Sequence, residues 1–397
     1  MANTLKFGNG EWYGKKDTIL AYNDENSNYK PLPFNFSRAS KATVINKDGL
    51  IEEVGSGQPR IDYKDDSEGA LLLEPSRTNF LTYSEDFSNN SYTKTNVTVT
   101  SGFLAPNGST NATKLVSSAV NGQLLFGGGS GNTNTKSVSV FAKANTSTSK
   151  FKIIEQYYSG HQTLFDLNLG VVEFNNSVGS KIEDYGNGWY KCTHIQSYTS
   201  GQTNATFAFR TNTPESLFIW GAQLEVGSYA TSYIPTQGST VTRVADACNN
   251  GGNEQVINST EGVLYAEISG LSQSNSNYYI TIGQNTINGI LGISFYTGNN
   301  RILFDYWVAG VETYHIESIS DITQFNKIAV CYNGTSIKGY INGVSVWNTT
   351  VTAFAVNAIS ELNFNYSGGN AFYGNVKDVR VYNEALTDQE LIALTQV

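Results

Sequence analysis

Short runs in which every second residue is hydrophobic recur along this chain, separated by clusters of glycine, asparagine and serine. This period of two is typical of β-strands, whose side chains point alternately to opposite faces. Along residues 189–195, Tyr190, Cys192 and His194 therefore share one face of a predicted strand and Trp189 lies on the other. The other runs before residue 244 are Val97/Val99, Val138/Val140/Ala142, Phe165/Leu167/Leu169, Phe207/Phe209 and Phe218/Trp220.

The last third of the chain shows the same period with clearer turns. Three alternating runs between Ile328 and Val346 are joined at Asn333-Gly334 and Asn342-Gly343. Asn-Gly favours the positive φ angles of tight hairpin turns, so these runs predict a meander of antiparallel strands. A short helix is predicted near the end of the chain. Thr387 and Glu390 can form a capping box, and Leu386 and Leu391 can form a hydrophobic staple.

Length and composition extend this picture to the whole chain. Its 397 residues are enough for two or three domains, and 24 tyrosines and 20 phenylalanines with only 15% charged residues favour strands. We expect an all-β fold with two β-sandwich (jelly-roll) domains after an extended N-terminal arm. The expected boundaries are 1–77 for the arm, 78–245 and 258–397 for the sandwiches, and a linker at 246–253, which is small, polar and glycine-rich.

Charge and cysteine content exclude several partners. The net charge of -9 opposes binding to nucleic acid and to anionic membranes, and no apolar run is long enough to insert into a bilayer. Cys192, Cys248 and Cys331 are odd in number and far apart, so neither a disulfide framework nor a metal knuckle is predicted. The first residues lack the apolar core of a signal peptide, which predicts synthesis in a cytoplasm.

Several motifs carry a resemblance to a known group of proteins. The first set is Phe36-Ser-Arg-Ala-Ser40, Gly49-Leu-Ile-Glu-Glu53, Pro59-Arg-Ile-Asp-Tyr63, Leu71-Leu-Leu-Glu-Pro-Ser-Arg-Thr-Asn79, Gly188-Trp189 and Gly221-Ala-Gln-Leu-Glu225. These motifs resemble virion proteins of tailed bacteriophages that contain a carbohydrate-binding-module-like jelly roll. The second set, within residues 261–397, is Ile337-Lys-Gly-Tyr-Ile-Asn-Gly343 and Gly374-Asn-Val-Lys-Asp-Val-Arg-Val-Tyr382. It resembles laminin-G-like, concanavalin A-type lectin folds.

This resemblance implies a structural component of a phage virion, made in the cytoplasm of the bacterial host. It implies a head or tail fibre, or a capsid decoration, that contributes to attachment to host-surface glycans. It also implies a homotrimer and a capsid or tail protein as partner of the arm at residues 1–77. One alternative is a purely structural decoration protein without a ligand, and another is a polysaccharide depolymerase.

The distribution of acidic residues and histidines argues against catalysis. The Glu-x-Asp-x-x-Glu arrangement of concanavalin-type glycanases is missing from residues 261–397, and Glu183 and Asp184 would face opposite sides of a strand. His161, His194 and His315 have no serine or cysteine partner at motif spacing. We therefore expect no catalytic residues and no enzyme.

No cofactor or metal is expected either. Cys192 and His194 share a strand face, yet half-buried packing explains both better than a metal does. An acidic loop without the pattern of a calcium site is best explained as solvated; its residues are Asp62, Asp65, Asp66 and Glu68.

Aromatic residues beside hydrogen-bonding side chains are the candidates for sugar binding. An aromatic ring stacks on the C–H face of a pyranose, while Asn, Asp or Gln bonds its hydroxyl groups. Trp189 and Trp220 are assigned to the core. The candidate carbohydrate-binding residues are Tyr157, Tyr158, His161 and Gln162 in the first sandwich, and Asp305, Tyr306 and Trp307 beside the Ala309-Gly310 turn in the second.

Overall fold

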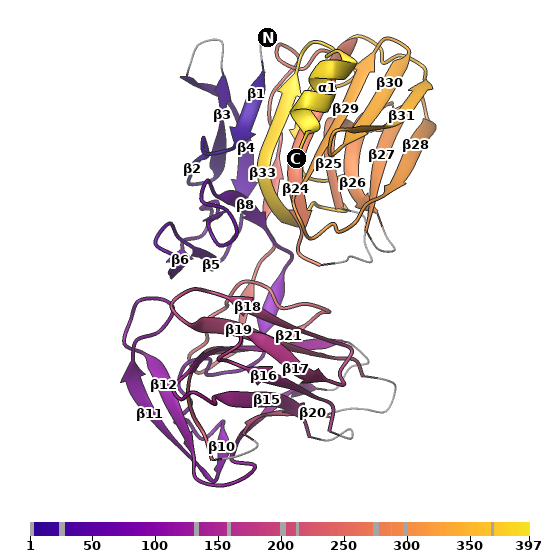
Figure 1. Ribbon diagram of the computed structural model, residues 1–397. Coiled ribbons are helices and arrows are strands. Elements are labelled where there is room, and N and C mark those ends of the chain that lie inside the picture. The colour runs from indigo at the N-terminus through magenta and orange to yellow at the C-terminus, as the bar shows by residue number, and fades with distance from the viewer. Residues whose placement is uncertain are drawn as a thin grey trace. The chain divides into compact units, whose positions relative to one another are not determined.

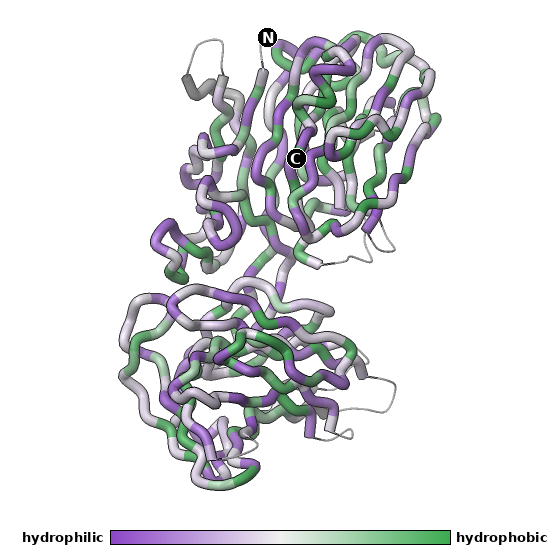
Figure 2. Tube along the Cα trace, viewed as in Figure 1, coloured by the Kyte–Doolittle hydropathy of each residue, from purple (hydrophilic) through white to green (hydrophobic). Residues whose placement is uncertain are grey.

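The computed structural model describes residues 4–23, 28–130, 135–156, 160–198, 204–211, 214–272, 278–286, 288–296, 300–366 and 369–397. The fold is all-β, as expected: strands β1 to β33 make up nearly all of the regular structure, and α1 (Asp388–Thr395) is the one helix among these residues (Figure 1). Hydrophobic and polar positions alternate along many strands (Figure 2). No helix in this part of the chain has the length and apolar character needed to cross a membrane.

The chain forms two compact units, and the second is inserted twice into the first. The first unit contains Met1–Lys41, Val54–Pro75 and Ala245–Val397, and the second contains Ala42–Glu53 and Ser76–Val244. This differs from the expected division into an arm and two successive sandwiches. Most of residues 1–77 belong to the same unit as the C-terminal sandwich, because their strands pair with strands near the end of the chain.

The large sheet of the first unit has twelve strands. In spatial order it contains β23 (Ala247–Asn249), β4 (Asn28–Ser37), β3 (Thr18–Asn23), β1 (Leu5–Gly8), β33 (Gly374–Tyr382), β24 (Glu261–Gly270), β29 (Asn326–Asn333), β30 (Ser336–Ile341) and β31 (Val344–Thr350). At its margins β2 (Tyr13–Lys15) pairs with β3, and β8 (Ala70–Leu73) pairs with β33 and with β7 (Ile61–Asp62).

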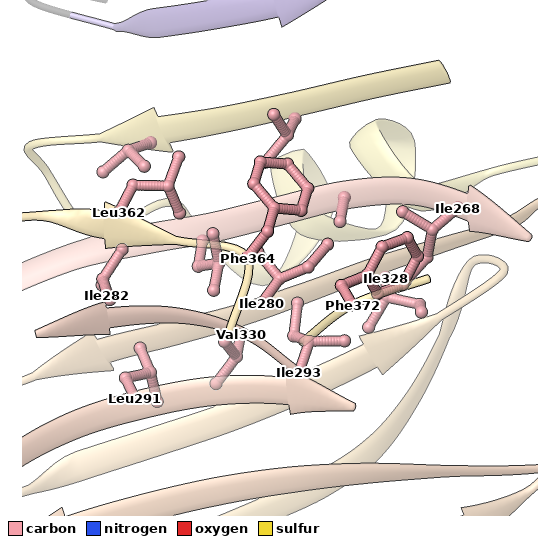
Figure 3. Packing of buried hydrophobic residues seen from close by; sticks show 14 of the residues in the cluster. Ile268, Ile280, Ile282, Leu291, Ile293, Ile328, Val330, Leu362, Phe364 and Phe372 are labelled. Atoms are coloured by element: carbon pink, nitrogen blue, oxygen red, sulfur yellow. The ribbon is translucent and has the colours of Figure 1, made fainter. Parts of the chain in front are cut away.

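A second sheet of five strands packs against part of this sheet through a common hydrophobic core. Its spatial order is β28 (Val311–Ser318), β27 (Arg301–Val308), β26 (Gly289–Tyr296), β25 (Tyr278–Thr286) and β32 (Leu362–Asn363). Residues such as Ile280, Ile293, Phe364 and Val330 meet in this core (Figure 3). Leu5 and Phe7 of β1 join the same core, so the N-terminal strands are part of this sandwich.

The predicted C-terminal meander and helix are confirmed, although the first turn is at Gly334-Thr335 because Asn333 pairs with Ser336. Asn342 and Gly343 both have positive φ, 49° and 80°, at the turn between β30 and β31. Thr387 caps α1, and Glu390 completes the capping box. Leu391 is fully buried with Leu386 packed beside it, in a small cluster on the helix-covered face of the large sheet.

The second unit is a sandwich of two six-stranded sheets. One contains β10 (Thr93–Thr95), β13 (Gln123–Ser130), β20 (Asn204–Arg210), β15 (Lys150–Glu155), β16 (Gln162–Asp166) and β17 (Val171–Asn175), in this order. The other contains β11 (Val97–Phe103), β12 (Ala112–Ser117), β21 (Ser216–Val226), β14 (Lys136–Ala144), β19 (Trp189–Gln196) and β18 (Gly179–Asp184). The pairs β5 (Ala42–Ile45) with β6 (Ile51–Val54) and β9 (Arg77–Asn79) with β22 (Val241–Arg243) complete the strands.

The predicted faces of β19 are confirmed in this sandwich. Cys192 and His194 are buried between the sheets, while Trp189 packs with Trp220 in a second cluster on the outer side of the sheet. One expectation from the alternation is wrong: Leu169 is 73% exposed, because β16 ends at Asp166 and the following residues form a turn.

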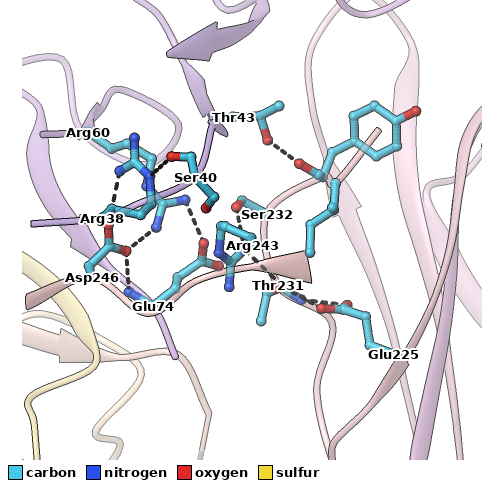
Figure 4. Close-up of polar contacts among 12 residues, drawn as sticks. Arg38, Ser40, Thr43, Arg60, Glu74, Glu225, Thr231, Ser232, Arg243 and Asp246 are labelled. Carbon is cyan, nitrogen blue, oxygen red and sulfur yellow. Dashed lines mark hydrogen bonds and ion pairs between the residues drawn. The ribbon is translucent and has the colours of Figure 1, made fainter. Parts of the chain in front are cut away.

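Arg38 and Arg60 of the N-terminal motifs lie in a buried ionic cluster of the first unit (Figure 4). Arg38 Nη1 lies 3.0 Å from Asp246 Oδ1, Arg60 Nη1 lies 2.6 Å from Glu74 Oε2, and Arg60 also pairs with the second oxygen of Asp246. Asp246 Oδ2 accepts a further hydrogen bond from the backbone N–H of Glu74, at 2.9 Å. Nearby carboxylates raise the pKa of Arg60 although burial alone lowers it. The cluster holds together segments that are distant in the sequence.

This cluster corrects the expectation of a linker at 246–253. Asp246 is fully buried, and residues 247–249 form strand β23, which pairs with β4. The boundary between the units lies just before it, between Val244 and Ala245. A small, polar, glycine-rich sequence suits a linker, but an acidic residue that neutralises two buried arginines suits the interior equally well.

Candidate functional site

The outer face of the five-stranded sheet carries polar and aromatic side chains. Along β27, Phe304 and Tyr306 point into the core, so Asp305 and Trp307 point to the outer face. The hairpin at Ala309-Gly310 places Tyr314 of β28 opposite Asp305, and Glu312 opposite Trp307. We call Asp305, Trp307, Glu312, Tyr314 and Tyr366 the Asp305 cluster.

Asp305 is the most unusual group on this face. Its side chain is only 1% exposed, and its Oδ1 has no hydrogen-bond partner among the described residues. Burial, followed by repulsion from the nearby Glu312 carboxylate and hydrogen bonding with it, raises the pKa of Asp305 to about 7. Near neutral pH this carboxyl group can therefore donate or accept a hydrogen bond.

Aromatic rings surround this carboxyl group. Tyr314 is 56% exposed, and Trp307 is half-buried. A hydrogen bond from Trp307 lowers the pKa of Asp305, against the larger effect of burial. Tyr366 packs on Tyr279, with 4.9 Å between ring centroids. Burial, followed by the charges of Asp305 and Glu312, raises the pKa of Tyr366 to about 12, so its hydroxyl stays protonated.

Gly292 leaves space at the centre of this face. It lies opposite Asp305 on one side and Thr281 on the other. A Cβ at this position would meet Thr281 Cγ2 at 3.3 Å and Tyr279 Cδ1 at 3.6 Å. A larger residue would therefore occupy the space beside the Asp305 carboxyl group. The arrangement offers hydrogen-bonding groups beside apolar rings, which is the combination that recognises a sugar.

The structure brings together only two of the seven candidate sugar-binding residues. Asp305 and Trp307 share the outer face, but Tyr306 lies on the opposite face, where its hydroxyl donates to the Thr352 carbonyl at 2.6 Å. Tyr306 is a core residue because neighbouring residues in a strand alternate. His161 and Gln162 are half-buried in the second unit, and each has a side-chain atom without a hydrogen-bond partner among the described residues. Tyr157 and Tyr158 lie outside the described residues.

Three residues of the Asp305 cluster were not among the candidates taken from the sequence. Glu312 and Tyr314 could have been found, because a hairpin centred on Ala309-Gly310 places them opposite Trp307 and Asp305. Tyr366 gave no usable signal, since it comes from a segment after β32 that has no periodic pattern.

The described residues contain no group of three or more His, Cys, Asp or Glu side chains placed to hold a metal ion. In the acidic loop, Asp66 forms an ion pair with Lys377 at 2.5 Å, and Lys377 lowers the pKa of Asp66 against the opposing effect of burial. Cys192, Cys248 and Cys331 are buried free thiols.

Comparison with known proteins adds a family match for part of the chain. Residues 265–392, less than half of the sequence, match the model of the concanavalin A-like lectin/glucanases superfamily. This stretch holds the whole five-stranded sheet, most of β24 and the strands β29, β30, β31 and β33 of the large sheet, and the whole Asp305 cluster. It is similar to laminin-G-like, concanavalin A-type β-sandwich domains. No curated protein matches the chain.

Solved structures show weaker likenesses. The sialidase module CBM40 of Ruminococcus gnavus, bound to α2,3-sialyllactose, is 15% identical over 35% of this chain and 83% of that one, with a TM-score of 0.31. Domain 4 of the arabinanase AbnA of Geobacillus stearothermophilus is 16% identical over 43% and 84%, with a TM-score of 0.32. Domains LG4-5 of the mouse laminin α1 chain are 12% identical over 70% and 89%, with a TM-score of 0.26. These values are too low to carry an argument about function.

Proposed function

We propose that the first unit binds carbohydrate at the Asp305 cluster and does not cleave it. One observation carries the proposal: a buried carboxyl group with an unbonded oxygen lies on an outer sheet face beside an exposed tyrosine and a half-buried tryptophan. Tyr314 and Trp307 would stack on the sugar ring, while Asp305 and Glu312 would bond its hydroxyl groups. The match to a lectin superfamily over residues 265–392 supports this class of ligand.

A glycan array with the full chain tests the proposal. The isolated fragment 261–397 would be unsuitable, because it lacks β1 and β8, which pair with β33. Tyr314→Ala removes an exposed ring and should weaken binding about three- to tenfold. Tyr13→Ala, at an exposed tyrosine of β2, is the matched control and should bind like the wild type. The proposal fails if the wild type binds no glycan above background, or if Tyr314→Ala binds as tightly as the wild type.

A second function, hydrolysis of a polysaccharide, is favoured by one feature. Asp305, with a pKa of about 7, and Glu312 form the kind of carboxyl pair that glycosidases use as acid and base. Such enzymes keep the two groups about 5–10 Å apart, with the glycosidic bond between them. Here the two carboxyl groups interact directly, which favours binding over cleavage. If the wild type released reducing ends from a polysaccharide and Glu312→Gln did not, hydrolysis would be the better explanation of the site.

The sequence resemblance adds a location to the proposal. We infer that the chain is part of a phage virion appendage and that its glycan is on the host surface, as the motifs between residues 36 and 79 suggest. Docking to the particle through residues 1–77 and assembly as a homotrimer stay predictions. Immunogold labelling of particles would test the location, and light scattering of the purified chain would test the trimer.

A further inference from the structure

Two basic residues face each other on the outer face of a sheet in the second unit. Lys152 of β15 lies directly opposite Arg210 of β20 in antiparallel register. Ile153 and Phe209 point into the core, so Lys152 and Arg210 point outward. Like charges directly opposite each other destabilise a sheet, which makes this pair a feature that needs an explanation.

Neither charge is neutralised by a carboxylate among the described residues. Lys152 forms no hydrogen bond or ion pair there, and Arg210 donates from Nε and Nη2 to the neutral Gln123 Oε1, at 2.9 and 2.5 Å. Two acidic residues of the same sheet, Asp166 and Glu173, are both bound by Lys150, at 3.1 and 2.8 Å.

The environment of the pair is unfavourable for its charges. Burial, and then the charge of Arg210, lowers the pKa of Lys152, and burial also lowers the pKa of Arg210. Both side chains are half-buried, so a bound anion would be only partly screened by water. The pair is therefore prepared to bind negative charge that the described part of the chain does not supply.

The neighbours of the pair complete a row across the sheet. Gln123 lies next to Arg210, and Leu164 and Phe174 follow Lys152 on the next two strands. Gln123 uses its carbonyl oxygen for Arg210, which leaves its amide group to donate. Phe174 is 47% exposed. The row thus has hydrogen-bond donors at one end and the exposed ring of Phe174 at the other. Phe174 is two strands from Lys152, which is about 10 Å at the usual strand spacing.

We propose that this row binds an acidic sugar, with the carboxylate at Lys152 and Arg210 and a neighbouring pyranose ring on Phe174. Carboxylates accept strong charge-assisted hydrogen bonds from both cations, and a ring of carbon-bound hydrogens packs on an aromatic face. A separation of about two strand spacings suits two linked sugar units. Nucleic acid is a poor candidate, since the chain carries a net charge of -9. The site lies in the second unit and does not depend on the Asp305 cluster.

Calorimetric titration of the full chain with tri-galacturonate tests this site, with the methyl ester of the same trisaccharide and inorganic sulfate as parallel probes. Lys152→Gln and Arg210→Gln should each weaken binding of the acid about ten- to a hundredfold. Phe174→Ala should weaken it less, and the ester should not bind. Lys181→Gln changes the net charge equally on the other sheet of the unit and is the matched control.

Binding of the acid that is lost in both charge variants and kept in Lys181→Gln supports the proposal. It is overturned if the acid does not bind, if acid and ester bind equally, or if the two charge variants bind like the wild type. Equal affinity for sulfate and for the sugar acid would overturn the assignment to a saccharide. Loss of acid binding in Lys152→Gln and Arg210→Gln reports on this row, and loss of glycan binding in Tyr314→Ala reports on the Asp305 cluster, so failure at the two sites is distinguishable.

Discussion

Arg38 and Asp246 are 208 positions apart in the sequence, yet they form an ion pair with both side chains fully buried. The carboxylate of Asp246 also neutralises Arg60. Its removal would leave the buried guanidinium groups of Arg38 and Arg60 without the carboxylate that they share.

Asp246→Asn should therefore lower the free energy of unfolding of the first unit by about 3–5 kcal/mol. Asp388→Asn is the control, because its partner Lys338 is near the surface and such pairs contribute about 1 kcal/mol or less. Urea unfolding of both variants measures the difference. Equal losses of unfolding free energy in Asp246→Asn and Asp388→Asn would contradict a stabilising role of the buried ionic cluster.

Phe7→Ala should destabilise the first unit by about 3–5 kcal/mol. Phe7 is fully buried, with its ring centroid 4.4 Å from that of Phe34. A free N-terminal arm would tolerate the change without loss. Thermal unfolding checks the prediction, and Tyr13→Ala on the neighbouring exposed strand should change stability by about 0.5 kcal/mol or less.

The stability of the first unit should fall as the pH rises from about 4 to about 7 through the contribution of Asp305. Its pKa is 3.8 in the unfolded chain and about 7 in the folded one, so the folded state binds more protons in this window. Asp305→Asn removes the titration and should raise the melting temperature more at pH 8 than at pH 4. A melting-temperature difference that does not depend on pH would refute the raised pKa.

His194 should make the second unit sensitive to acid. Thr163 donates to Asn175 Oδ1 at 2.9 Å, so His194 Nδ1, 2.9 Å from the Thr163 hydroxyl, carries a proton and donates to it. The other ring nitrogen, Nε2, has no hydrogen-bond partner among the described residues. Burial, aided by His161, lowers the pKa of His194 from 6.5 to about 3.

The unfolded state therefore binds more protons between pH 6.5 and 3, and stability is lost as the pH falls through this range. The protection factors of the β19 amides, which correct for the slower intrinsic exchange in acid, should fall on acidification in the wild type and less so in His194→Gln. His315→Gln, in the first unit, should leave the acid response of β19 as it is in the wild type. Identical acid responses in wild type and His194→Gln would count against this role.

The sequence predicted the fold class and much of the second unit because its strands carry a local signal, the alternation of hydrophobic residues. Strand β1 was missed because Leu5 and Phe7 form too short a run, and because Leu5 pairs with Val381, at the far end of the chain. Asp246 was assigned to a linker because hydrophobicity alone does not reveal a carboxylate that neutralises buried arginines.

For the Asp305 cluster, the alternation of side chains along the strand placed Asp305 and Trp307 on one face. The same rule places Tyr306 on the opposite face and would have excluded it from the candidate sugar-binding residues. The turn at Ala309-Gly310 contains enough information to add Glu312 and Tyr314. Tyr366 and the raised pKa of Asp305 depend on burial by segments far away in the sequence, which no local pattern encodes.

The pairing of β1 with β33 determines the order in which the two units can fold during translation. Residues 42–53 and 76–244 can complete the second unit while the C-terminal strands have not yet been synthesised. Strands β1 and β8 must wait for their partner strand at residues 374–382, which takes on the order of tens of seconds at a translation rate of about 5–20 residues per second. During that interval their apolar residues are exposed, and a chaperone could bind them.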